Sequence, residues 1–136
     1  MQNIENINGK TALGFDANIG ALFCYLGNLL FSLGLVYSII VVVQDKTTKL
    51  TRFHAFQSIL CSALGAVFGV GLGIVAAVAV FIDAAIGAPI LSLFIGLVAL
   101  IVGLVLLVFY FKAVARAYRG EIYKIPFIGN MAEKWA

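Results

Sequence analysis

The chain has 136 residues, of which 63% are hydrophobic and 11% are charged, and its formal net charge is +3. Three stretches carry no charged residue at all, namely 17–44, 55–82 and 84–111. Each stretch is longer than the about 20 apolar residues that a helix needs to cross a bilayer. The composition therefore excludes an ordinary soluble domain, and the short length leaves no room for a separate catalytic domain.

The order of polar and apolar segments predicts the architecture. Residues 1–15 lack hydrophobic periodicity, so we expect a loose tail there. The three apolar stretches predict three helices, over about 17–43, 53–82 and 90–119. Residues 121–136 mix aromatic and basic side chains, which is typical of a segment at the membrane surface. We expect an all-α integral membrane protein that forms a single domain, with three transmembrane helices and a short interfacial C-terminal segment.

The basic residues are distributed unevenly. With three spans, the 44–54 link and the C-terminal tail lie on one side of the membrane, and that side holds every Lys and Arg except Lys10. The positive-inside rule then places the N-terminus outside and the C-terminus in the cytoplasm. The charge indicates contact with the lipid bilayer and does not indicate nucleic-acid binding. We therefore expect a multi-pass membrane protein with this orientation.

Small residues recur at every fourth position in the first two predicted helices. The first ridge consists of Gly20, Cys24, Asn28 and Ser32, and the second of Cys61, Gly65, Gly69 and Gly73. Lipid provides no hydrophobic drive for helix association, so small residues that let two backbones approach closely are what holds such helices together. We predict that both ridges are packing surfaces, used within the chain, between copies of it, or with other membrane-protein subunits.

A polar motif opens the second predicted helix and another follows the third. The first contains Arg52, His54 and Gln57, and the second contains Arg119 and Glu121. Because both motifs emerge on the basic side and buried polar groups need partners, we predict that they form one cytoplasmic polar cap. In this interpretation His54 donates or accepts a hydrogen bond within the protein, and Arg52 pairs with Glu121 or with a lipid phosphate. The alternative is that His54 is a ligand to a haem or chlorophyll-type metal, or a proton-relay group.

These motifs carry a resemblance. Arg-Phe-His-Ala-x-Gln-Ser at 52–58, Arg-Gly-Glu-x-Tyr-x-Ile-Pro-x-Ile-Gly at 119–129 and Gly-Phe-Asp-Ala-Asn at 14–18 resemble the Tic-twenty-like family. That family comprises small bacterial membrane proteins of unknown function, related to a protein-import component of the chloroplast inner envelope. The resemblance implies a multi-helix membrane architecture over nearly the whole chain. It also implies a bacterial inner membrane as the location, and it suggests a part in protein translocation.

Three functions remain open on the sequence. The chain has no phosphate-binding loop, no metal-ligand cluster and no nucleophile–base pair, so we expect neither an enzyme nor a metal or cofactor site. We favour a non-enzymatic accessory or scaffold subunit of a larger membrane complex. The second hypothesis is a translocation or pore component that acts as an oligomer, and the third is a pigment- or haem-binding subunit through His54.

Overall fold

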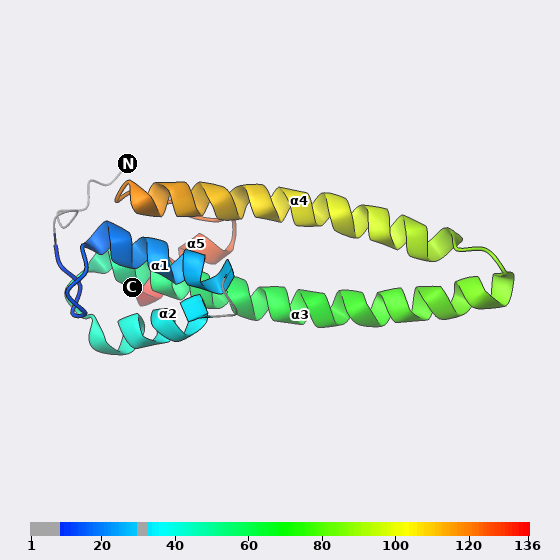
Figure 1. The fold of residues 1–136 in the computed structure, drawn as a ribbon, viewed down its shortest axis with the longest axis horizontal. Helices are drawn as coiled ribbons and strands as arrows, with labels where there is room; N and C mark the ends of the chain where they lie inside the picture. Colours follow the sequence, from blue (N-terminus) through cyan, green and yellow to red (C-terminus); the bar gives the residue numbers. More distant parts are fainter. Residues whose placement is uncertain (1–8, 30–32) are drawn as a thin grey trace. The chain divides into compact units, whose positions relative to one another are not determined.

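The computed structural model describes residues 9–29 and 33–136, and within them the regular structure is helical apart from one isolated bridge between Lys10 and Asp16 (Figure 1). The helices are α1 (Ala17–Leu29), α2 (Leu33–Gln44), α3 (Lys49–Ile86), α4 (Ile90–Tyr118) and α5 (Ile128–Trp135). The all-α prediction is therefore confirmed for the described residues.

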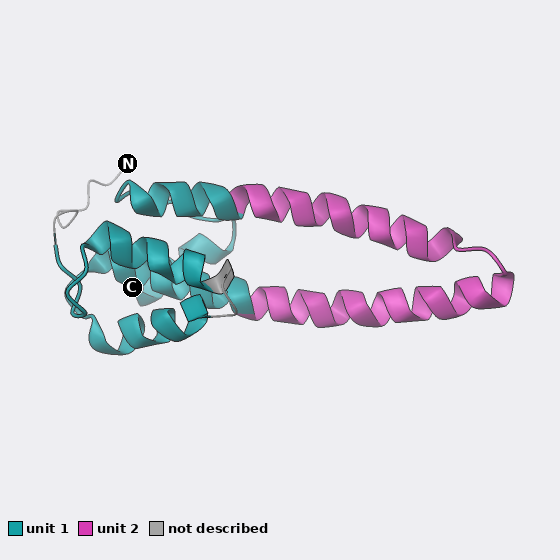
Figure 2. Cartoon of the chain, viewed as in Figure 1, with its two compact units in different colours: residues 1–62, 110–136 teal, residues 63–109 magenta. Residues whose placement is uncertain are grey.

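The helices divide into two compact units (Figure 2). Unit 1 consists of residues 1–62 and 110–136, and unit 2 consists of residues 63–109. Unit 1 contains α1, α2 and α5 with the first part of α3 and the last part of α4, whereas unit 2 contains the remainder of α3 and α4 with the turn between them. The single domain that the sequence suggested stays a prediction.

One continuous helix over 17–43 was the wrong prediction, because this stretch forms two short helices that pack against each other. A Cβ built on Gly27 near the end of α1 would lie only 2.5 Å from the Cα of Gly34 near the start of α2. In a continuous helix, residues seven apart are separated by about 10 Å along the axis, so the chain must fold back between these two glycines. Glycine permits this contact because it has no Cβ, and it also weakens a helix by about 1 kcal/mol relative to alanine.

The other two predicted spans are present as helices, and α3 is longer than expected. It begins at Lys49 and ends at Ile86, whereas 53–82 was predicted, and α4 ends within a residue of its predicted limit. Both helices are long and apolar enough to cross a membrane, while α1 and α2 are shorter apolar helices. The described residues thus contain two candidate spans, and three transmembrane helices are not observed.

Local hydrogen bonds and two glycines define the turn between α3 and α4 and the end of α4. The carboxylate of Asp83 accepts from the backbone N–H groups of Leu91 and Ser92, at 2.9 and 2.7 Å, so it satisfies donors in the first turn of α4. Gly87 lies in the turn with a φ of 77°. At the other end of α4, Gly120 has a φ of 72°, and Glu121 N–H donates to the carbonyl of Arg116. This left-handed glycine is a frequent way for a helix to stop.

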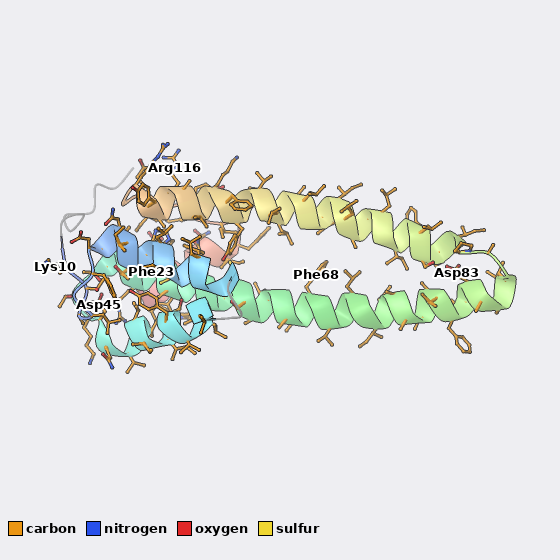
Figure 3. The ribbon with its side chains drawn as sticks, viewed as in Figure 1. Lys10, Phe23, Asp45, Phe68, Asp83 and Arg116 are labelled. Atoms are coloured by element: carbon orange, nitrogen blue, oxygen red, sulfur yellow. The ribbon has the colours of Figure 1, made fainter. Side chains whose placement is uncertain are left out.

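The buried side chains lie largely in unit 1. Tyr25 and Phe53 are the largest of them, and small residues such as Ala113 and Ala117 let the helices approach one another. Unit 2 is different, because its apolar side chains are mostly exposed. Phe68 of α3, which is labelled in Figure 3, is 52% exposed. A water-soluble unit would bury such residues, so the exposed surface of unit 2 fits a lipid environment.

Candidate functional site

The most elaborate polar arrangement in the described residues lies in unit 1. Tyr25 of α1 and His54 and Gln57 of α3 are fully buried. We call these three side chains the buried polar network. The Tyr25 hydroxyl is 2.9 Å from His54 Nδ1 and accepts a hydrogen bond from Gln57 Nε2 at 2.9 Å. His54 and Gln57 reach the same hydroxyl because residues three apart share one face of a helix.

The segment after α4 closes the network. His54 Nε2 is 3.2 Å from the carbonyl oxygen of Glu121, and Gln57 Nε2 donates to the carbonyl oxygen of Tyr123 at 3.1 Å. Ile125 N–H donates to Gln57 Oε1 at 3.3 Å. The sequence placed His54 and Gln57 near this segment, and the structure brings them together through backbone atoms.

The partners fix the direction of each hydrogen bond. A carbonyl oxygen can only accept, so His54 Nε2 carries the proton and Nδ1 accepts from the Tyr25 hydroxyl. That hydroxyl in turn accepts from Gln57. Both nitrogens of the neutral His54 ring are therefore occupied by protein groups, and neither can bind a metal unless the network is broken.

Three hydroxyl groups hold α1 against the rest of unit 1. Thr51 donates to the carbonyl of Ala17 at 3.0 Å, and Ser58 donates to the carbonyl of Cys24 at 2.6 Å. The Tyr110 hydroxyl donates to the carbonyl of Tyr25 at 2.6 Å. Each is a bond from a side chain to a backbone oxygen, so the position of α1 depends mainly on residues in α3 and α4.

Arg52 makes different contacts from those that the sequence suggested. Its guanidinium donates to the carbonyls of Val42 and Asp45, at 3.2 and 2.9 Å, and to the carbonyl of Ala136 at 3.3 Å. It also lies 5.7 Å from the ring centroid of Phe56. Arg52 therefore ties the end of α2 to the C-terminal end of the chain.

Glu121 has a different partner from the one that the sequence suggested. Its carboxylate forms an ion pair with Arg116, and both side chains are partly exposed. Arg119 is exposed at the end of α4. Of the five residues predicted for the cap, the structure thus brings together His54, Gln57 and the backbone of Glu121.

The link between α2 and α3 is held by Asp45. Its carboxylate accepts from the backbone N–H groups of Thr47 and Thr48, at 3.0 and 3.1 Å, and from both threonine hydroxyls. Burial raises the pKa of Asp45, but the hydrogen bonds from Thr48 and Thr47 outweigh it, so that this pKa lies below its usual value.

The two predicted ridges have different surroundings. In the first, Gly20 and Cys24 lie inside unit 1, and a Cβ on Gly20 would come within 2.8 Å of the Thr11 methyl group. The side chains of Asn28 and Ser32 lie outside the described residues. In the second ridge, Cys61 is half-buried, and a Cβ on Gly65, Gly69 or Gly73 would meet no described atom within 4 Å.

Sequence reasoning did not assign the role of Tyr25. Tyr25 lies in an uncharged stretch, and a buried hydroxyl there needs a hydrogen-bond partner. The pair His54 and Gln57 on one helix face could have indicated that partner. Tyr110 of α4 is likewise a hydroxyl in an uncharged stretch that needs a partner. Among the described residues, no group of three or more His, Cys, Asp or Glu side chains is arranged to hold a metal ion.

Comparison with known proteins gives the family. A model described as the magnetosome magnetite crystal formation protein family matches residues 16–132. The chain belongs to this family. A UPF0132 membrane protein of Methanocaldococcus jannaschii is 34% identical over 128 residues, which cover 94% of this chain and 96% of that protein. A second one from the same organism is 29% identical, over 91% of this chain and 73% of the relative.

A third relative supports the same family assignment. A UPF0132 membrane protein of Archaeoglobus fulgidus is 27% identical over 79% of this chain and 89% of its own length. No solved structure matches the chain significantly. Because these relatives are membrane proteins, the chain is a membrane protein as well. The resemblance to the Tic-twenty-like family was the wrong interpretation, since the family model and the relatives point to the magnetosome formation family instead.

Proposed function

We propose that the chain is a non-enzymatic membrane protein that serves as an accessory or scaffold subunit of a larger membrane complex. This proposal rests on the hydrogen bonding of the buried polar side chains. Tyr25, His54 and Gln57 bond to one another and to the backbone of residues 121–125, so they hold the fold together and present no free reactive atom. What remains for function is the apolar helix surface.

The surface of unit 2 suits a scaffold. Gly65, Gly69 and Gly73 form an open strip on α3, since a Cβ at any of them would meet no described atom within 4 Å. Such a strip lets the backbone of another transmembrane helix approach closely, which is the main source of helix association in lipid. We assign the strip to contact with a helix of another subunit.

The description of the family names magnetite crystal formation, and we propose an indirect part in such a process for this chain. Carboxylates are ligands that suit hard metal ions. Between residues 53 and 111 the single charged residue is Asp83, and both of its carboxylate oxygens accept bonds from α4 backbone. The turn between α3 and α4 therefore offers no free carboxylate to a mineral. This favours a function in which the chain organises other membrane proteins over one in which it contacts the crystal.

The alternative functions have less support. The translocation hypothesis came from a resemblance that the comparisons replace. The pigment or haem hypothesis needs a free nitrogen on His54, and both nitrogens are within hydrogen-bond distance of protein groups. For localisation, we propose a cytoplasmic membrane with the C-terminus in the cytoplasm, because five basic residues lie in the C-terminal part of the last span or after it, namely Lys112, Arg116, Arg119, Lys124 and Lys134.

The glycine strip gives a sharp experiment. Gly69→Leu adds a bulky side chain where the chain itself leaves open space, so we expect the isolated protein to keep its fold and to lose its partners. Val78→Leu is the matched control, because Val78 is already bulky and 54% exposed. After mild cross-linking in the membrane, both variants are purified in mild detergent and the attached subunits are counted. Unchanged attachment in Gly69→Leu would remove the strip from the proposal.

Other results of the same purification test the wider proposal. If the wild-type chain is isolated as a monomer from cross-linked membranes, the scaffold function is wrong. A complex that contains only copies of this chain would favour an oligomer over a heteromeric complex. A bound absorbing cofactor would support the third hypothesis.

A further inference from the structure

The α1–α2 hairpin raises a question that the function leaves open, which is where it lies relative to the membrane. Its helices have 13 and 12 residues, so they are about 20 and 18 Å long. The hydrocarbon core of a bilayer is about 30 Å thick. Neither helix can cross it, and the chain folds back at the close contact of Gly27 with Gly34.

Hydrogen bonds within unit 1 show which ends lie together. Thr51 near the start of α3 donates to the carbonyl of Ala17, which begins α1. Asn18 in the first turn of α1 donates to the carbonyl of Tyr118 at the end of α4, at 3.2 Å. The start of α1, the start of α3 and the end of α4 are therefore at one level. A third span would instead place the start of α1 at the level of the 87–89 turn.

The direction of the hairpin follows from a second contact. Ser58 donates to the carbonyl of Cys24, so seven residues along α1 correspond to seven residues along α3 between these contacts. The two helices thus run in the same direction from a common level. Gly27 lies ten residues beyond Ala17, which is about 15 Å along the helix and equals about one leaflet.

The surface of the hairpin suits acyl chains. Apart from Gln44 at the end of α2, the exposed side chains among its described residues are apolar, and they include Phe23, Leu26, Leu33, Val36, Ile39 and Val43, which are between 39% and 66% exposed. Charged residues occur only outside the hairpin, at Glu5, Lys10 and Asp16 before α1 and from Asp45 onward after α2. An apolar segment whose helices are each too short to cross enters and leaves the bilayer on the same side.

We propose that the α1–α2 hairpin is a re-entrant element that contacts the acyl chains of the cytoplasmic leaflet, so that both ends of the chain lie in the cytoplasm. The distribution of charge agrees with this topology. Only α3 and α4 then cross the membrane, and all 9 Lys and Arg residues fall on one side. Asp83 is the one charged residue left for the other side. The three-span prediction would separate Lys10 from the other basic residues.

The first test uses the native chain with a protease-sensitive peptide tag on either end. Right-side-out and inside-out membrane vesicles are treated with protease. We expect both tags to be cleaved in inside-out vesicles and protected in right-side-out vesicles. Cleavage of the N-terminal tag in right-side-out vesicles, with the C-terminal tag protected, would show a complete first span and overturn the proposal.

The second test asks what covers the hairpin. Val36→Cys is labelled with a fluorophore in a chain that lacks Cys24 and Cys61, and lipids with a nitroxide at a shallow or a deep position of the acyl chain act as quenchers. We expect stronger quenching by the deep nitroxide at position 36, which lies eight residues or about 12 Å from the end of α2, as in the control Leu100→Cys in α4. Absence of quenching at position 36 would mean that protein covers the hairpin, and it would overturn the lipid contact.

Discussion

Replacing Gln57 by leucine tests the buried polar network most directly, because this one side chain makes three hydrogen bonds. It donates to the Tyr25 hydroxyl and to the Tyr123 carbonyl, and it accepts from Ile125 N–H. Leucine has a similar volume but makes none of these bonds. Each net hydrogen bond contributes about 1 kcal/mol, and a buried donor left without a partner costs about 1–3 kcal/mol. We expect Gln57→Leu to lower the free energy of unfolding by about 2–4 kcal/mol.

The single tryptophan of the chain supplies the assay. Trp135 lies in α5 with its ring centroid 6.1 Å from that of Phe56, one residue before Gln57. Denaturant titration in mild detergent, followed by Trp135 fluorescence, should show a lower midpoint for Gln57→Leu at an unchanged slope. The matched control is Gln44→Leu, because Gln44 is exposed at the end of α2. If both variants unfold at the wild-type midpoint, the network does not stabilise unit 1.

Two further predictions follow from the hairpin and the link after it. Gly27→Ala should destabilise the chain by several kcal/mol in the same titration, because its Cβ would overlap the backbone of Gly34, whereas Gly103→Ala in the open part of α4 should have little effect. Asp45 has a lowered pKa in the folded chain, so its contribution to stability is present above about pH 4 and is lost as the pH falls through the folded value. Asp45→Asn should flatten this part of the stability–pH curve, and an unchanged curve would contradict the lowered pKa.

The sequence predicted α4 well because every signal there acts locally. The uncharged run 84–111 covers most of the helix, which extends from residue 90 to residue 118. Pro89 precedes its first residue, and Gly120 follows shortly after its last. Local signals need no knowledge of the rest of the fold. The same reasoning placed α3, although its start moved to Lys49 because Asp45 satisfies the donors of Thr47 and Thr48 just before it.

The fold of residues 17–44 could not be predicted in the same way. A continuous span and a pair of short helices have the same apolar composition, so length and hydropathy do not separate them. The deciding contact joins Gly27 and Gly34, and it exists only once the chain has folded back. A cue was present in the charges, since a two-span topology collects all 9 basic residues on one side and a three-span topology does not.

The sequence predicted where the candidate site lies, but it did not predict the hydrogen-bond partners of its residues. His54 and Gln57 could be assigned to one helix face and to the side of the C-terminal segment, because both follow from spacing and topology. Their partners are mainly backbone carbonyls and the Tyr25 hydroxyl, and backbone positions in a loop leave no mark in the sequence. For the same reason Arg52 was expected to pair with Glu121 or with a lipid phosphate. Glu121 pairs with Arg116 instead, Arg52 donates to three backbone oxygens, and the lipid phosphate stays a prediction.

The way α1 is held explains why a short, unremarkable apolar segment can keep a defined position at a membrane. In lipid, expelling water from between helices contributes little, so packing alone holds a 13-residue helix weakly. Hydrogen bonds keep their strength there, and α1 receives them from Thr51, Ser58 and Tyr110 at its own backbone carbonyls. The donors of these three bonds therefore reside in α3 and α4, while α1 contributes small residues at the contacts, such as Ala17 and Cys24, together with the Tyr25 hydroxyl of the buried polar network. Because a re-entrant helix cannot be fixed by crossing the bilayer, such bonds from neighbouring helices are what fixes its depth.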